Sequence, residues 1–145
     1  DVVRFIDRLP HEDALGLLKQ SDMALISTGL GAQTRPGWLP SKLFEYLGCR
    51  IPILAITPEG EAADIIRRTN SGYVVTSEDH DAIGRILETE MARKFGGTGL
   101  PSRTFTFAGV ERYGEGQVML EMARILRSTA QGRGPAGTEP AMITP

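Results

Sequence analysis

Short runs of apolar residues alternate, along the first two thirds of the chain, with segments in which apolar residues recur at helical spacing. Four runs rich in β-branched or other apolar residues predict short strands, at residues 2–6, 23–27, 52–56 and 73–75. Helical spacing predicts four helices, over about residues 14–20, 42–47, 62–70 and 79–94. Because the two kinds of element alternate, the pattern predicts an α/β fold with a parallel sheet and helices on both faces.

The last third of the chain carries one further helical pattern and a polar tail. An apolar stripe over 117–127 predicts an amphipathic helix. Residues 128–145 are rich in glycine and proline and are predicted to be disordered. Together these patterns predict a single Rossmann-like three-layer domain over residues 1–127. The chain starts directly at a predicted strand, so we expect this domain to be incomplete at its N-terminus.

The segment from Pro40 to Gly48 joins the long loop 28–39 to the predicted strand at 52–56. Ser41 after Pro40 is a natural N-cap, and Gly48 is a natural left-handed end of the helix. Two charged residues are placed unfavourably in the predicted helix. Lys42 lies in the first turn, where the helix dipole disfavours a cation, and Glu45 follows it in the less stabilising order. The pair is either a solvated surface ion pair or part of an anion site at the helix N-terminus.

Composition and charge exclude several classes of function. The chain has 145 residues, 41% of them hydrophobic and 23% charged, and a net charge of -2, which gives no electrostatic footprint for nucleic acid. No apolar run approaches the length of a membrane span. A single cysteine excludes an internal disulfide, and two isolated histidines form no metal-binding pattern. The glycine fingerprints of dinucleotide and P-loop proteins and the nucleophile elbow are missing from the sequence.

The sequence Pro-Ser-Lys-Leu-Phe-Glu-Tyr-Leu-Gly-Cys-Arg-Ile-Pro-Ile-Leu, residues 40–54, resembles the donor-binding segment of GT-B glycosyltransferases of the group 1 (family 4) type. Four flanking segments resemble the same family in order and spacing: 3–10, 21–26, 58–66 and 71–75. The resemblance covers about residues 1–127 and implies the C-terminal, donor-binding domain of such an enzyme. It implies transfer of a sugar from a nucleotide-sugar donor, with retention of configuration and without a metal ion.

The resemblance also implies roles for individual residues. Glu45 would accept hydrogen bonds from the donor ribose, the amides of Ser41 and Lys42 would contact the diphosphate, and Arg8 and Leu9 would border the nucleobase. Where the family often has an acid that contacts the donor sugar, this chain has Gly37.

That departure implies that sugar recognition either differs from the family pattern or shifts to the neighbouring loop residues Gln33, Thr34 or Arg35. Trp38, the only tryptophan, lies in the same loop. It either pins the loop to the domain or offers a flat platform to a sugar.

Further implications of the resemblance concern the whole enzyme. The catalytic groups and the acceptor site would lie in a preceding N-terminal domain of the same chain, so we expect the present chain to transfer no sugar alone. The acceptor would be a sugar, a lipid-linked carrier or a polysaccharide in bacterial envelope synthesis. We expect a cytoplasmic location, either free or peripheral on the inner membrane face.

Two alternatives stay open. A GT-B-like sugar-nucleotide epimerase would use the same donor site without an acceptor. A non-catalytic α/β nucleotide-binding or interaction module is the second, but a receiver-like domain needs clustered acids at its strand ends. The first predicted strand ends at Asp7, which has no acidic neighbour in the sequence.

Overall fold

The computed structural model describes residues 3–28, 38–96 and 104–130. The chain forms two compact units, Asp1–Val110 and Glu111–Pro145. The first unit contains, in chain order, α1 (His11–Lys19), β1 (Ala24–Ser27), α2 (Ser41–Cys49), β2 (Ile53–Ile56), α3 (Glu61–Thr69), β3 (Gly72–Val75) and α4 (His80–Phe95). A short 3-10 helix, η1 (Val110–Tyr113), spans the division, and the second unit contains α5 (Glu115–Ala130).

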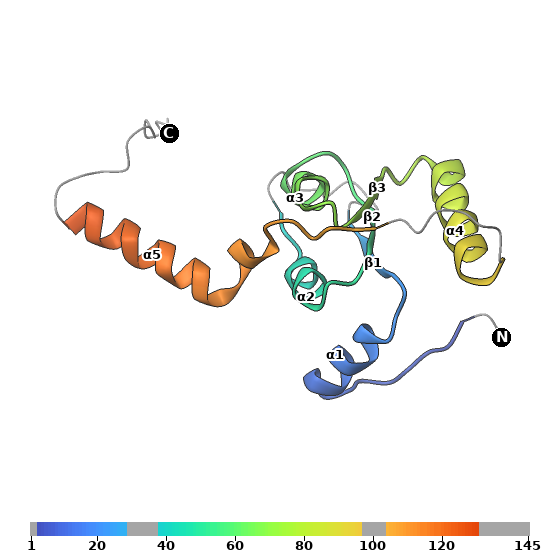
Figure 1. The fold of residues 1–145 in the computed structure, drawn as a ribbon, viewed down its shortest axis with the longest axis horizontal. Coiled ribbons are helices and arrows are strands. Elements are labelled where there is room, and N and C mark those ends of the chain that lie inside the picture. The colour runs from blue at the N-terminus through green and yellow to red at the C-terminus, as the bar shows by residue number, and fades with distance from the viewer. Residues whose placement is uncertain (1–2, 29–37, 97–103, 131–145) are drawn as a thin grey trace, which may run out of the picture. The chain divides into compact units, whose positions relative to one another are not determined.

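The three strands form one parallel sheet in the order β1-β2-β3, with Ile53 opposite Ala24 on one side and Gly72 on the other. In Figure 1, α2 and α3 lie on one side of this sheet and α4 on the other. The prediction of an α/β fold with a parallel sheet is therefore confirmed.

The fourth predicted strand, at 2–6, is wrong for the residues that the structure describes. Residues 3–6 form no strand, and Phe5 is 94% exposed. A run with strand propensity becomes a strand only when its backbone groups find a neighbouring ladder, and Val3–Ile6 pairs with none of the described strands.

The core lies between the sheet and the two helices on its first side. Helix α2 contributes Leu43 and Leu47, and α3 contributes Ile65 and Ile66, each at most 1% exposed. Ile53, in the central strand, is fully buried beneath them. Leu43 and Leu47 are four residues apart on α2, and Ile65 and Ile66 lie three residues after the buried Ala62 and Ala63 of α3, so each helix turns one apolar stripe towards the sheet. The position of α2 is thus fixed by its buried face, which leaves its polar residues on the outer side.

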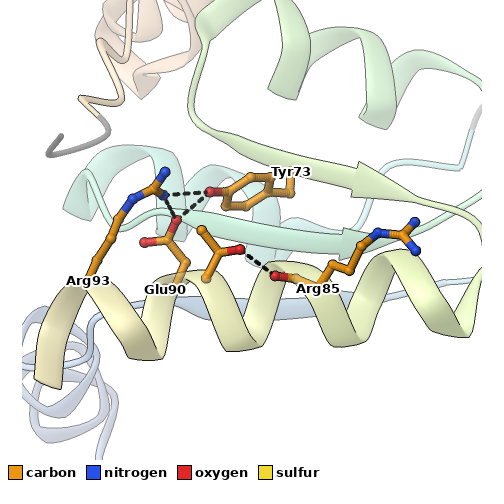
Figure 2. A network of polar contacts seen from close by, with 5 residues as sticks. Tyr73, Arg85, Glu90 and Arg93 are labelled. Atoms are coloured by element: carbon orange, nitrogen blue, oxygen red, sulfur yellow. Dashed lines mark hydrogen bonds and ion pairs between the residues drawn. The ribbon is translucent and has the colours of Figure 1, made fainter. Parts of the chain in front are cut away.

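Helix α4 has no fully buried residue and is attached to the sheet by polar contacts. Figure 2 shows the Tyr73 hydroxyl donating to the carboxylate of Glu90, with the Arg93 guanidinium donating to both. The hydrogen bond to Tyr73 and the charge of Glu90 raise the pKa of Arg93. The Tyr73 ring meets Phe105 edge-on, with centroids 5.4 Å apart. This cluster holds α4 against β3.

The ends of α2 differ from the prediction. Pro40 occupies the N-cap position, so Ser41 is the first helical residue and makes no capping hydrogen bond with its side chain. Gly48 lies inside the helix, and the left-handed residue is Arg50, with φ of 54°. The helix ends in a Schellman arrangement, because Ile51 donates to the Tyr46 carbonyl at 3.1 Å and Arg50 to that of Leu47.

We expect Gly48→Ala to raise the stability of the domain by about 0.5–1 kcal/mol, since alanine has the higher helix propensity. The added methyl group meets no atom within 4 Å. Chemical denaturation monitored by circular dichroism measures the change. If Gly48 were instead the left-handed end of the helix, the substitution would destabilise the protein.

Helix α5 confirms the predicted helix at 117–127 and extends it at both ends. It runs through Ala130, so the first three residues of the segment predicted to be disordered are helical. None of its residues is buried, and its apolar side chains, including Val118, Met122 and Ile125, are exposed within its unit. Among the described residues, no helix combines the length and the apolar character required to cross a membrane.

Candidate functional site

A hollow of about 370 Å³ lies between α1, the segment that precedes it, and the outer face of α2. Its size is at the lower end of the range found for small-molecule sites. Its walls are formed by Ile6, Asp7, Leu9, Ala14, Leu15, Leu17, Leu18, Ser21, Lys42, Glu45 and Tyr46. The hollow therefore combines an apolar wall from α1 with a polar wall from α2.

The polar wall is organised around one ion pair. The Lys42 ammonium donates to Glu45 Oε2 at 2.7 Å, from one turn of α2 to the next. The Lys42 side chain is 58% exposed and that of Glu45 only 27%. The hydrogen bond to Glu45 raises the pKa of Lys42, so the lysine is charged at neutral pH. The surface ion pair considered from the sequence is thus present, and both of its members line the hollow.

The start of α2 places backbone donors beside this wall. The earliest residue to accept a hydrogen bond from α2 is Pro40, whose carbonyl receives the Leu43 N–H at 3.0 Å. The amides of Ser41 and Lys42 precede that bond, as the first amides of any helix do. No acidic residue occupies the first turn of α2. The positive end of the helix dipole therefore lies beside the Lys42 ammonium, which favours an anion there.

The apolar wall comes from a helix that contributes nothing to the core. Helix α1 has no buried residue, although its apolar residues recur at helical spacing. It lies against α2 rather than against the sheet, and Leu15, Leu17 and Leu18 line the hollow instead. The hollow exists because the apolar stripe of α1 is only partly covered by α2.

The structure brings together three of the residues assigned from the sequence: Lys42, Glu45 and Leu9. Ser41 and Arg8 are not among the lining residues, although each adjoins one. Trp38 is 59% exposed and is also not part of the wall. The donor-sugar assignments to Arg35 and Gly37 lie outside the described residues.

The turn at 58–61, which belongs to a segment included in the family resemblance, does not line the hollow. Glu59 instead forms a two-pronged ion pair with Arg67, at 2.5 and 2.7 Å, which holds the turn against α3. This hydrogen-bonded pair lowers the pKa of Glu59 and raises that of Arg67. Both carboxylate oxygens of Glu59 are thereby occupied.

Sequence reasoning missed Asp7 and Tyr46 as site residues. Both line the hollow, and Asp7 directly precedes the two residues that were assigned to the nucleobase. Its position next to Arg8, which was assigned to the nucleobase, could have indicated that Asp7 lies at the site. Tyr46 follows Glu45 in α2, and its position on the outer face depends on which residues of α2 are buried.

A second, smaller hollow of about 230 Å³ lies between β3 and α4, lined by Tyr73, Ala82, Arg85, Ile86, Thr89 and Arg93. Figure 2 shows that Tyr73 and Arg93 are already engaged with Glu90. We therefore assign this hollow to the contact between α4 and the sheet, and not to a binding site. In the part of the chain that the structure describes, no three His, Cys, Asp or Glu side chains are grouped so that they could hold a metal ion.

No family model matches this chain, and no curated protein or solved structure matches it. The fold and the site together define an α/β protein with a parallel sheet and an open hollow on the outer side of α2.

Proposed function

We propose that this chain is the donor-binding part of a GT-B glycosyltransferase, and that the hollow beside α2 receives the nucleotide of a nucleotide-sugar donor. The observation that supports this most is the joint presence of Lys42, Glu45 and Leu9 in one hollow at the start of a helix. These are residues for which the sequence resemblance implies contacts with the diphosphate, ribose and nucleobase.

The chemistry of each part of the hollow fits a nucleotide. A carboxylate accepts hydrogen bonds from vicinal hydroxyls, as Glu45 would from a ribose. The amides at the start of α2 and the Lys42 ammonium attract phosphate oxygens. The leucines of α1 offer an apolar surface to a planar base. The site thus matches the three chemically different parts of a nucleoside diphosphate.

In sugar transfer, this arrangement would act on the leaving group. As the bond to the sugar breaks, negative charge grows on the diphosphate, and fixed donors at a helix N-terminus stabilise it without reorganisation. The catalytic groups and the acceptor site are proposed to lie in a further domain. A cytoplasmic location, free or peripheral on the inner membrane face, fits this role. An epimerase would share the donor site and differ in its product.

A panel of UDP, GDP, ADP and CMP tests the proposal by thermal melting. A nucleotide at 100 times its dissociation constant stabilises the protein by about 2.7 kcal/mol, which raises Tm by several degrees in a domain of this size. We expect stabilisation by at least one nucleoside diphosphate, reduced in Lys42→Ala. Lys19→Ala, in α1 but outside the hollow, is the matched control. Unchanged melting with every nucleotide, at concentrations up to the millimolar range typical of weak sites, would contradict the proposal.

A further inference from the structure

We propose that the hollow selects guanine among the nucleobases, because the carboxylate of Asp7 reads the two adjacent N–H groups on the edge of the base. This inference rests on the proposed function and specifies the donor as a guanosine diphosphate sugar. It comes from Asp7, a residue that the sequence resemblance left without a role.

Asp7 is the second carboxylate of the hollow and lies on a different element from Glu45. It belongs to the segment before α1, whereas Glu45 projects from α2. Among the described residues, Glu45 is paired with Lys42, but Asp7 makes no hydrogen bond or ion pair. Its two oxygens are therefore available as acceptors for a molecule bound in the hollow that Asp7 helps to line.

The charges of the wall decide which part of a nucleotide can lie inside. Lys42 and Glu45 offset each other, and the charge of Asp7 is left over. A wall with a surplus carboxylate repels a phosphate and attracts hydrogen-bond donors. The diphosphate is thus expected at the exposed edge of the hollow, beside Lys42 and the first amides of α2, with the nucleoside inside the hollow.

The same two carboxylates match the donors of a nucleoside. Ribose offers its hydroxyl groups to Glu45 at the α2 wall, and the base offers its N–H groups to Asp7. The base lies between these groups against apolar side chains such as Leu9 and Leu18. Asp7 and Glu45 would then set the orientation of the nucleoside from its two ends.

The donor pattern of the bases distinguishes guanine from the others. Guanine presents the N1–H and the 2-amino group side by side, so one carboxylate can accept both. Uracil has a single N–H, which lies between two carbonyl oxygens. A carboxylate that accepted from this N–H would be repelled by the oxygen on either side. Adenine and cytosine each place a ring nitrogen acceptor beside the amino group. A site built to accept two adjacent donors rejects bases that lack them.

Isothermal titration of the chain with GDP, UDP, ADP and inosine diphosphate tests this assignment. Inosine diphosphate keeps the N1–H and lacks the 2-amino group. We expect GDP to bind about 10-fold more tightly than UDP or ADP, with inosine diphosphate between them. Asp7→Asn should weaken GDP binding by about 10-fold and leave the binding of UDP and ADP unchanged or tighter, because the amide presents one acceptor and one donor and no longer repels the acceptors of those bases.

Asp13→Asn, in α1 and outside the hollow, is the matched control and should bind all four nucleotides as the native chain does. Equal binding of GDP and UDP, or an Asp7→Asn variant with unchanged GDP affinity, would overturn the guanine assignment alone. Binding of none of the nucleotides would overturn the proposed function together with it.

Discussion

Replacement of Gly72 by alanine is expected to abolish the fold of the sheet-containing unit. A Cβ atom at this position would lie 2.0 Å from the Ile53 carbonyl oxygen, and 2.7 and 2.8 Å from the Ile53 carbonyl carbon and amide nitrogen. All three atoms are backbone, so no rotation of a side chain relieves the overlap. Gly72 is the first residue of β3 and pairs directly with Ile53 in the central strand.

The neighbouring strand cannot move away from the added methyl group. Ile53 is fully buried, and on its other side it pairs with Ala24 of β1. Relief would require β3 to separate from β2, with loss of the ladder and of the core beneath it. We expect a loss of about 4 kcal/mol or more, a large part of the total stability of a domain of this size.

Circular dichroism and thermal melting measure this effect, with Gly84→Ala as the matched control. Gly84 lies in α4, and a methyl group added there meets no atom within 4 Å. The control should retain the native spectrum and melt at the native temperature or slightly above it. A Gly72→Ala variant that melted within about 3 °C of the native protein would contradict the close approach of Gly72 to the Ile53 backbone.

The three observed strands could be predicted from the sequence because each is a short apolar run that finds a neighbour. The run at 2–6 has a similar composition and was predicted with the same rule, yet Val3–Ile6 is not a strand. Pairing is a property of two segments, whereas composition describes one. The role of Gly72 is hidden for the same reason, since its closeness to Ile53 follows from the register of two strands.

The ends of α2 show the limit of local rules. Gly48 has the residue type of a helix end, but the helix continues through Cys49 and turns at Arg50. Leu43 and Leu47 are buried one turn apart, and this packing favours the helical conformation of the residues between and just beyond them. Tertiary contacts therefore outweighed the preference of a single glycine.

For the candidate site, spacing within one helix was predictable and contact between helices was not. Lys42 and Glu45 are three residues apart, so any helix places them on neighbouring turns, where they form the observed ion pair. Asp7 enters the hollow only because α1 lies against α2. The sequence pattern gave α1 an apolar face but not the partner of that face.

Glu45→Gln is expected to weaken the binding of a nucleoside diphosphate by about 10-fold or more and to leave the binding of inorganic pyrophosphate unchanged or stronger. The neutral amide is a poorer acceptor for the ribose hydroxyls than the carboxylate. The same change releases Lys42 from its ion pair, so its ammonium becomes available to phosphate oxygens. The two ligands therefore respond in different directions only if Glu45 contacts the ribose.

Titration calorimetry with both ligands separates this role from a structural one. Glu88→Gln, in α4 and outside the hollow, controls for the loss of one negative charge. The 2′-deoxy form of the nucleotide supplies a second control, because it should bind the native chain and Glu45→Gln with more similar affinities. An equal loss of nucleotide and pyrophosphate binding in Glu45→Gln would instead mean that the ion pair with Lys42 shapes the start of α2, and that the ribose lies elsewhere.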